Sequence, residues 1–124
     1  MAKIVLVDDH PDVREVVGQL LTMHGHSVTF MTSGEMALER LETEKPQIVI
    51  ADHRLPEMSG VQLLKSIRED SRFRDVRCIL FSADSNIQEL AEQADAHEFW
   101  IKGSDSVFDA IAQLESSIAA NGSK

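Results

Sequence analysis

The chain has 124 residues, 43% of them hydrophobic and 27% charged, and 21 acidic against 12 basic residues give a formal net charge of −9. This length supports one hydrophobic core, so we expect a single domain over residues 1–124 with a polar tail at 121–124. The negative charge disfavours direct binding to nucleic acid or to an anionic membrane, because like charges repel. The single cysteine, Cys78, excludes an intrachain disulfide and a cysteine-based zinc site.

No apolar run approaches the ~18 residues that a membrane-spanning helix needs. Residues 1–7 also lack the pattern of a secretory signal peptide. We therefore expect a cytoplasmic protein that does not contact membranes.

Short strand signals recur along the chain. Unbroken apolar runs at 4–7, 48–51 and 78–81 are typical of strands that are covered on both faces. Two weaker strands are expected at 27–31, where the alternation suits a sheet edge, and at 99–101.

Helical spacing of apolar residues predicts a helix after each strand. These helices are expected to begin near Pro11, after Gly34, after Gly60, after Ser85 and near Val107. Capping boxes are expected at three of the starts, from the pairs Thr32 with Glu35, Ser59 with Gln62, and Ser85 with Gln88. Strands that alternate with helices predict an α/β fold with a parallel sheet and helices on both of its faces.

Polar residues follow four of the expected strands. Asp8 and Asp9 follow the first, Asp52 the third, Ser82 the fourth and Lys102 the fifth. Ligands of such a sheet bind beyond the carboxyl ends of its strands, so we expect these side chains to converge. Three close carboxylates repel one another unless a cation shares them, and hard oxygen ligands suit Mg²⁺. A carboxylate can also accept a phosphoryl group, whose charge an ammonium and a hydroxyl would neutralise.

Four segments resemble the receiver domain of two-component response regulators, and the resemblance runs from Lys3 to about Ile118. They are Asp8-Asp9, Asp52 to Gly60 (DHRLPEMSG), Phe81-Ser82-Ala83 and Ile101-Lys102-Gly103. The resemblance implies a doubly wound (βα)5 fold, a flavodoxin-like three-layer sandwich with parallel strands in the order 2-1-3-4-5. It also implies that a sensor histidine kinase or phosphotransfer protein donates a phosphoryl group from a phosphohistidine, which the domain later hydrolyses.

The resemblance assigns roles to the acidic residues. Asp52 would be the phosphoacceptor. Asp9, Asp52 and the backbone carbonyl of Arg54 would hold Mg²⁺, and Asp8 would contribute mostly through water. A divalent cation is therefore the expected cofactor.

The same resemblance predicts a switch. Ser82 and Lys102 would bind the phosphoryl group, and Phe99 would be the switch aromatic. Phosphorylation adds about −1.5 to −2 charge, which would draw the Ser82 hydroxyl inward and leave space for Phe99. The face around the fourth helix and fifth strand would then bind an unknown output partner with an affinity that depends on phosphorylation.

Arg54 and Asp84 carry opposite charges and should lie on loops that face the same opening. A salt bridge between them would either screen the phosphoryl group from water, and so tune its lifetime, or be an exposed pair worth about 0–1 kcal/mol without kinetic effect. The sequence favours neither interpretation.

Two residues depart from the family pattern. Gly103 follows Lys102 where the family usually has proline, often with a cis peptide bond, so we expect a more mobile loop before the last helix. Asp95 stands where glycine is usual and must make the same turn with more strain. Both positions lie beside the predicted switching surface.

The histidines carry weaker predictions. His24 and His26 flank a glycine and are expected to be solvated loop residues. His10 and His53 each follow a site acid, and either could bind a softer metal. His53 should point away from Asp52 if strand alternation continues, and both histidines are left outside the predicted metal set.

Three other functions compete with the receiver. A magnesium-dependent phosphatase with an aspartyl nucleophile usually has Asp-x-Asp after the first strand, which Val7-Asp8-Asp9-His10-Pro11 does not supply. A flavin mononucleotide binder needs a phosphate loop where this chain has two repelling carboxylates. A docking module that works without phosphorylation stays open because of Gly103 and Asp95.

Overall fold

The computed structural model describes residues 2–104 and 106–122, with side chains described as far as position 114. Its strands form one parallel sheet in the order β2-β1-β3-β4-β5. The strands are β1 (Lys3–Val7), β2 (Ser27–Met31), β3 (Ile48–Asp52), β4 (Arg77–Ser82) and β5 (Glu98–Ile101). The helices are α1 (Pro11–Met23), α2 (Gly34–Glu44), α3 (Gly60–Glu69), α4 (Ile87–Ala94) and α5 (Ser106–Gly122), with a short 3₁₀ turn at Ser71–Phe73. The predicted fold class and strand order are confirmed.

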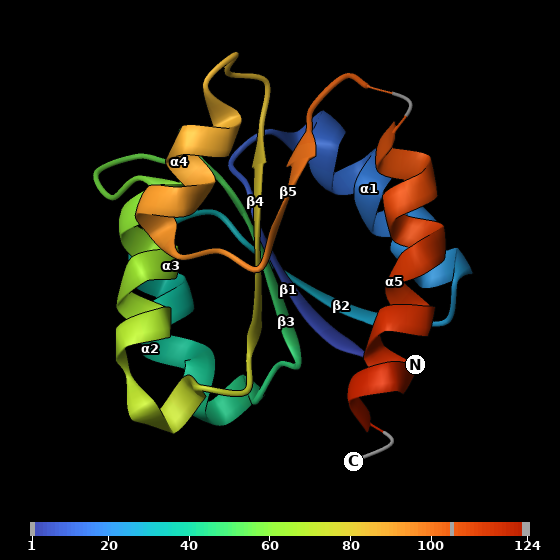
Figure 1. Cartoon of the computed structure of the whole chain (residues 1–124), viewed down its shortest axis with the longest axis horizontal. Helices are drawn as coiled ribbons and strands as arrows, with labels where there is room; N and C mark the ends of the chain where they lie inside the picture. Colours follow the sequence, from blue (N-terminus) through green and yellow to red (C-terminus); the bar gives the residue numbers. More distant parts are fainter. Residues whose placement is uncertain (1, 105, 123–124) are drawn as a thin grey trace.

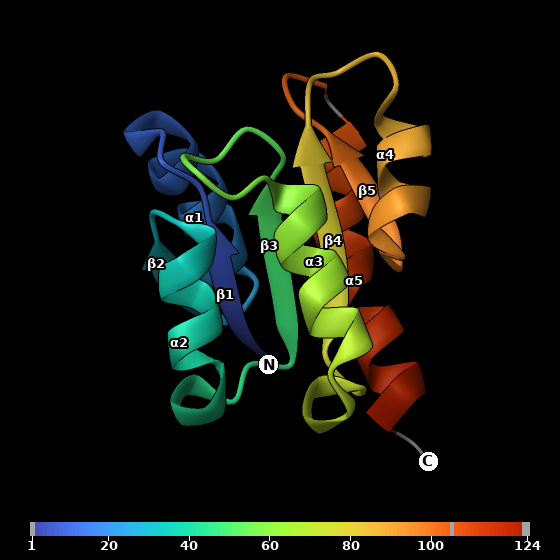
Figure 2. The same ribbon diagram turned by 90° about the vertical axis from the view of Figure 1, so that its left-hand side faces the viewer.

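The sheet lies between two helical layers (Figure 1). Helices α2, α3 and α4 cover one face, and α1 and α5 cover the other. Figure 2 looks onto the first layer and shows the strands pointing toward one edge, where the loops after β1, β3, β4 and β5 gather. The polar residues expected at the strand ends therefore lie at this common edge.

Both faces of the sheet are buried, which explains the unbroken apolar runs. In β1, Val5 and Val7 pack toward α2 and α3, whereas Ile4 and Leu6 pack toward α1 and α5. Full burial of each aliphatic side chain stabilises the fold by roughly 1.5–3 kcal/mol, so the central strands anchor the sheet. The predicted edge strand, β2, pairs only with β1 among the described strands and is partly exposed.

One of the three expected capping boxes is present. The hydroxyl of Ser59 accepts a hydrogen bond from the Gln62 backbone N–H, and the Gln62 side chain accepts one from the Ser59 N–H. The expectation for Thr32 was wrong, because α2 starts one residue later and Ser33 accepts from the Met36 N–H.

The expectation for a capping box at Ser85 with Gln88 was also wrong. Asn86 is the N-cap of α4 and makes no side-chain capping bond. The helix start is instead supported by a backbone hydrogen bond from the Ile87 N–H to the Asp84 carbonyl.

The expectation for His26 was wrong as well. This residue is buried immediately before β2, and its Nδ1 accepts a hydrogen bond from the Ala2 backbone N–H at 3.1 Å. The partner lies 24 residues away in the chain, which is why local sequence did not reveal it. His24 is exposed as expected.

Helix α5 extends through Gly122, so half of the expected polar tail is helical. Ser123 and Lys124 lie outside the described residues, as does the side chain of Ile118, which was expected on the buried face of this helix. Among the helices that the structure describes, none is long and apolar enough to cross a membrane.

Candidate functional site

The predicted residues Asp8, Asp52 and Lys102 meet at the carboxyl edge of the sheet. The Lys102 ammonium lies 3.0 Å from Oδ2 of Asp8 and 3.0 Å from Oδ2 of Asp52. The side chain of Asp8 is 0% exposed and that of Asp52 is 3% exposed. Together with Asp9 beside them, we call these four side chains the acid pocket.

Strand pairing brings the acid pocket together. Val7 of β1 lies opposite Ala51 of β3, so the next residues, Asp8 and Asp52, emerge side by side. Across the sheet, the Lys102 backbone N–H donates to the Ser82 carbonyl at 2.9 Å. This hydrogen bond fixes the backbone position from which the lysine side chain extends. Its ammonium then passes over the ring of Phe81, 5.3 Å from the ring centroid.

Burial dominates the electrostatics of Asp52. Its desolvation raises the pKa of the carboxyl above its ordinary value, although the hydrogen bond with Lys102 acts in the opposite direction. The nearby charge of Asp8 raises the pKa further. The ionised pocket is therefore under-neutralised, and an additional cation near Asp52 would stabilise its charged form.

His10 joins this pocket, although the sequence interpretation left it outside. Its Nδ1 lies 2.9 Å from Oδ1 of Asp8, 3.3 Å from Oδ1 of Asp9 and 3.5 Å from Oδ2 of Asp52. The hydrogen bond with Asp8 raises the pKa of His10, and the positive charge of Lys102 partly opposes that shift. His53 does not join the group, as expected, and its Nδ1 is buried without a hydrogen bond from the described residues.

The pocket has the donors that a divalent cation requires. One ligand atom each from Asp8, Asp9, His10 and Asp52 can be chosen so that all lie within 4.8 Å of one another. Oδ2 of Asp8 and Oδ2 of Asp52 are buried and share the Lys102 ammonium, which lies 3.0 Å from each. One ammonium cannot neutralise two buried carboxylates, so both oxygens fit a cation that would coordinate them.

The Ser82 hydroxyl is turned toward Asp84 in this structure. It donates a 2.5 Å hydrogen bond to Oδ2 of Asp84, and the Asp84 N–H donates back to it at 3.0 Å. The expected ion pair is also present, with Arg54 Nη2 at 2.6 Å from Oδ1 of Asp84. These hydrogen bonds from Arg54 and Ser82 lower the pKa of Asp84.

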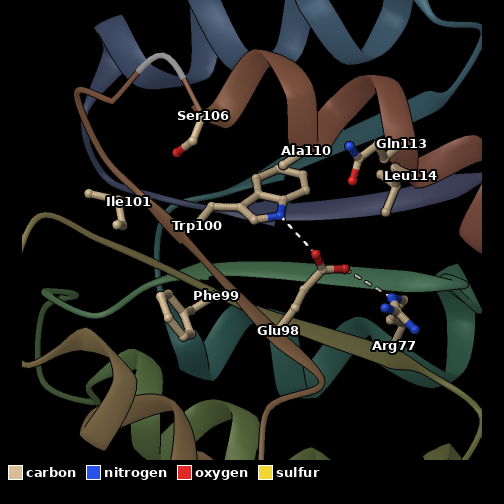
Figure 3. Close-up of a pocket in the computed structure, with 9 residues that line it drawn as sticks. All are labelled: Arg77, Glu98, Phe99, Trp100, Ile101, Ser106, Ala110, Gln113 and Leu114. Carbon is tan, nitrogen blue, oxygen red and sulfur yellow. Dashed lines mark hydrogen bonds and ion pairs between the residues drawn. The ribbon is translucent and has the colours of Figure 1, made fainter.

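Phe99 and Trp100 leave β5 in opposite directions (Figure 3). Phe99 packs against the core beneath α4, while Trp100 is buried toward α5 and meets Phe81 edge to face. Both line a surface pocket of about 560 Å³ between β5 and α5. This pocket contains no residue of the acid pocket and none of α4, so it adjoins the predicted output face only through β5.

Gly60 closes the loop that follows Asp52. A Cβ on Gly60 would lie only 2.2 Å from the Asp52 carbonyl oxygen, and its N–H donates to the His53 carbonyl at 2.9 Å. The Arg54 N–H meanwhile donates to Oδ1 of Asp52 at 3.3 Å. The loop can therefore fold tightly over the carboxylate only if position 60 carries no side chain.

A family model for the response regulator receiver domain matches residues 4–108. The chain belongs to this family. Receiver domains are signalling domains that interact with histidine kinases or phosphotransfer proteins, and this chain has the expected flavodoxin-like architecture of five parallel strands in the order 2-1-3-4-5.

Similar proteins agree with this assignment. Two-component response regulator ORR5 of Oryza sativa subsp. japonica is 34% identical over 83 residues, which cover 66% of this chain and 62% of the rice protein. A LuxR-family response regulator from Aurantimonas sp. is 28% identical with a TM-score of 0.83, covering 97% of this chain and 86% of the other. The receiver domain of sensor histidine kinase PA1611 from Pseudomonas aeruginosa, whose structure contains a coordinated magnesium ion, is 26% identical with a TM-score of 0.78, covering 93% and 92%.

The two departures from the receiver pattern adopt left-handed backbone. Gly103 has φ of 78°, and a Cβ at this position would meet no described atom within 4 Å, so glycine serves the backbone angle rather than a tight contact. Asp95 has φ of 56°, which confirms that an aspartate makes the turn where the family usually has glycine. Left-handed backbone costs a non-glycine residue roughly 1–2 kcal/mol, so the turn before β5 is strained.

Sequence reasoning missed two contributors to the receiver site. His10 could have been found from its place directly after the acid pair, but its ring direction depends on the start of α1. Gly60 stands in the quoted motif, yet its contact with the Asp52 backbone is visible only in three dimensions.

Proposed function

We propose that this receiver accepts a phosphoryl group on Asp52 from the phosphohistidine of a sensor histidine kinase or phosphotransfer protein, and signals through a change in its surface. The observation that carries the proposal is the buried Asp52 carboxylate at the end of β3, 3.0 Å from the Lys102 ammonium. Membership of the receiver family supports the same chemistry. We place this reaction in the cytoplasm.

In the proposed transfer, a carboxylate oxygen of Asp52 attacks phosphorus. The new O–P bond forms as the N–P bond of the phosphohistidine breaks, and the imidazole nitrogen keeps the electron pair. Lys102 would move from its carboxylate contacts to an oxygen of the phosphoryl group, where its positive charge offsets the added negative charge. Ser82 would leave Asp84 and donate to another phosphoryl oxygen.

Asp8, Asp9, Asp52 and the backbone carbonyl of Arg54 would hold Mg²⁺ in the proposed site, with Asp8 acting mostly through water. When bound, the ion supplies charge neutralisation at the phosphoryl oxygens. The buried oxygens of Asp8 and Asp52, which share a single ammonium, support this assignment. The magnesium ion in the PA1611 receiver is consistent with it.

Arg54 and Asp84 have a second proposed role in the lifetime of the phosphoryl group. Their ion pair bridges the loops after β3 and β4, and in this proposal it would limit the access of water to Asp52. Arg54 is itself 76% exposed, so the pair would limit this access only partly. The same Asp84 also competes with the phosphoryl group for the Ser82 hydroxyl.

The proposed output runs through Ser82 and Phe99 to the face formed by α4 and β5. Withdrawal of the Ser82 hydroxyl from Asp84 would free space near the β4–α4 loop for the Phe99 ring. An output partner would then distinguish the two states of this face. We expect Phe99→Ala to abolish that distinction. A variant whose two forms keep the partner affinities of the wild type would refute the relay.

The decisive experiment follows intact mass after incubation with acetyl phosphate and Mg²⁺. We expect a phosphoryl adduct on the wild type that disappears in Asp52→Asn or after chelation of Mg²⁺. Asp75→Asn is the matched control, because Asp75 is an exposed aspartate just before β4. An adduct that persists in Asp52→Asn would refute the phosphoacceptor assignment.

Two alternatives predict different results. A docking module would bind its partner equally well without any adduct forming on the wild type. A phosphatase would release phosphate from a phosphoester with steady turnover that does not depend strongly on Lys102. The close approach of Lys102 to Asp52 favours the phosphoacceptor, because a single stable adduct needs its charge neutralised.

A further inference from the structure

The His10 ring has an unusual position for an exposed histidine. Its side chain is 57% exposed, yet Nδ1 contacts carboxylate oxygens of Asp8, Asp9 and Asp52 rather than water alone. These carboxylates come from two separate strand ends, β1 and β3. The nitrogen therefore lies at the point where the acidic residues converge.

The three contact distances have the size expected for neighbouring ligands of one ion. Two ligands at right angles, each about 2.1–2.2 Å from a metal, are about 3 Å apart. The distances from His10 Nδ1 to the three oxygens are 2.9, 3.3 and 3.5 Å. Small adjustments of the side chains would thus allow the nitrogen and the oxygens to share a cation.

A simple ion pair explains this arrangement less well. Oδ1 of Asp8 already accepts the His10 backbone N–H at 2.9 Å, and Lys102 already supplies positive charge to Oδ2 of Asp8 and of Asp52. One carboxylate would be enough to pair with an imidazolium ring. Contact with three carboxylates places the nitrogen inside the group of candidate ligands.

We propose that His10 Nδ1 is a ligand in the metal site, and that it makes the site select a later divalent first-row transition ion, such as Co²⁺ or Ni²⁺, over Mg²⁺. This inference rests on the proposed function, because it uses the same carboxylates. Imidazole is a good ligand for transition ions, whereas Mg²⁺ prefers oxygen ligands and retains its waters. A bound imidazole would carry its remaining proton on Nε2.

Pulsed electron paramagnetic resonance on the Mn²⁺-loaded protein tests the ligand directly. We expect nitrogen modulation of the electron spin echo in the wild type and its loss in His10→Ala and His10→Gln. His53→Ala is the matched control, since His53 also follows a site acid but lies outside the ligand group. Modulation that is absent from the wild type, or that persists in both His10 variants, would overturn the proposal.

Calorimetric titrations with Co²⁺ and with Mg²⁺ test the selectivity. We expect His10→Ala to weaken Co²⁺ binding by about ten- to a hundredfold, the range seen when groups that support a metal site are lost, and Mg²⁺ binding far less. An equal loss for both ions would overturn the proposal. A gain in affinity for both ions would also overturn it, because that is the result of removing a competing positive group.

The outcomes separate this inference from the proposed function. Thermal unfolding of each variant confirms that it is folded before metal is added. If Asp52 gains a phosphoryl group with Mg²⁺ but His10 shows no nitrogen coordination, the receiver chemistry stands and the histidine ligand fails. If nitrogen coordination is seen but no adduct forms on Asp52, the metal ligand stands and the phosphoacceptor fails.

Discussion

The acid pocket and the switch region differ in how the fold holds them. The acid pocket follows the buried central strands β1 and β3, and its two innermost carboxylates are 0% and 3% exposed. The proposed switch region comprises Ser82 at the end of β4, Phe99 on the short edge strand β5, and Asp84 and Gly103 on the loops that follow these two strands. The proposed phosphoacceptor is therefore built on buried strand ends, and most of the proposed switch on a sheet edge and on loops.

Lys102 belongs to both parts of the molecule. Its ammonium contacts Asp8 and Asp52, while its backbone continues β5 and bonds to the Ser82 carbonyl. The residue after it, Gly103, has φ of 78°, and no described neighbour would crowd a side chain there. The lysine thus connects the buried acid pocket to a loop with open space around it, and substitutions at this junction test the difference between the two regions most directly.

The largest effect is expected for Lys102→Ala. Loss of the ammonium that faces Asp52 should slow phosphorylation by acetyl phosphate by about 10²–10³-fold, the range for losing one donor to a developing anionic centre. The rate of adduct formation by intact mass measures this. Lys65→Ala, on the exposed side of α3, is the control and should leave the rate unchanged. Equal rates for the Lys102 variant and the wild type would show that phosphorylation of Asp52 does not depend on the Lys102 ammonium.

The next largest effect is expected on the free energy of unfolding, when Gly60 beside the acid pocket and Gly103 in the switch region are each replaced by alanine. Gly60→Ala should lower the free energy of unfolding by about 1–3 kcal/mol, because its Cβ would overlap the Asp52 carbonyl. Gly103→Ala has open space and should cost only the left-handed backbone penalty of roughly 1–2 kcal/mol. Urea unfolding measures both. Phosphorylation should suffer in the Gly60 variant and survive in the Gly103 variant; the reverse would show that the pocket is not the more rigid of the two regions.

Asp52→Asn should stabilise the protein at neutral pH. Burial raises the pKa of Asp52 in the folded state, so ionisation opposes folding. This cost appears as the pH rises above the ordinary pKa of aspartate and is complete once the pH has passed the raised value. The variant should therefore be more stable than the wild type at neutral pH, with no advantage in acid.

Urea unfolding as a function of pH measures this difference, and exposed Asp75→Asn should show none. Addition of Mg²⁺ should stabilise the wild type more than Asp52→Asn, because the variant lacks one of the proposed ligands. A variant that is less stable than the wild type throughout the pH range would show that Asp52 is not a strained, functional carboxylate.

The smallest effect on stability is expected for Arg54→Ala. Its ion pair with Asp84 is exposed on the arginine side, so its loss should change the free energy of unfolding very little. The phosphoryl group should nevertheless decay faster, because water gains access to Asp52. Asp84→Ala also releases the Ser82 hydroxyl, and comparing the two decay rates by mass separates the roles. A decay rate for Arg54→Ala within error of the wild type would remove the screening role.

Local signals predicted the strand ends well and the caps less well. The apolar runs mark the strands because both faces of a central strand need apolar side chains, so the residues after them were identifiable. The capping box at Ser59 was also predicted. Those expected at Thr32 and Ser85 failed because a neighbouring residue, Ser33 or Asn86, stands at the start of the helix. Which of two adjacent polar residues caps a helix depends on how the chain enters it.

Contacts between distant segments could not be predicted in this way. His26 is buried because a backbone N–H from the start of the chain reaches its ring. Gly60 is required because the loop returns onto the Asp52 backbone. Each contact depends on how two distant segments are placed relative to each other. The sequence around each segment contains no signal that predicts this placement.

The alternating architecture, the family and the residues at the strand ends were all readable from the sequence, because they depend on local hydrophobic pattern and on the order of short motifs. Three-dimensional packing was needed to show that Ser82 is held by Asp84 and that the His10 nitrogen lies among three carboxylates. The directions of these side chains depend on neighbours supplied by other strands and loops. The directions of the side chains in the site are therefore decided by which segments the fold brings together, and not by residue type alone.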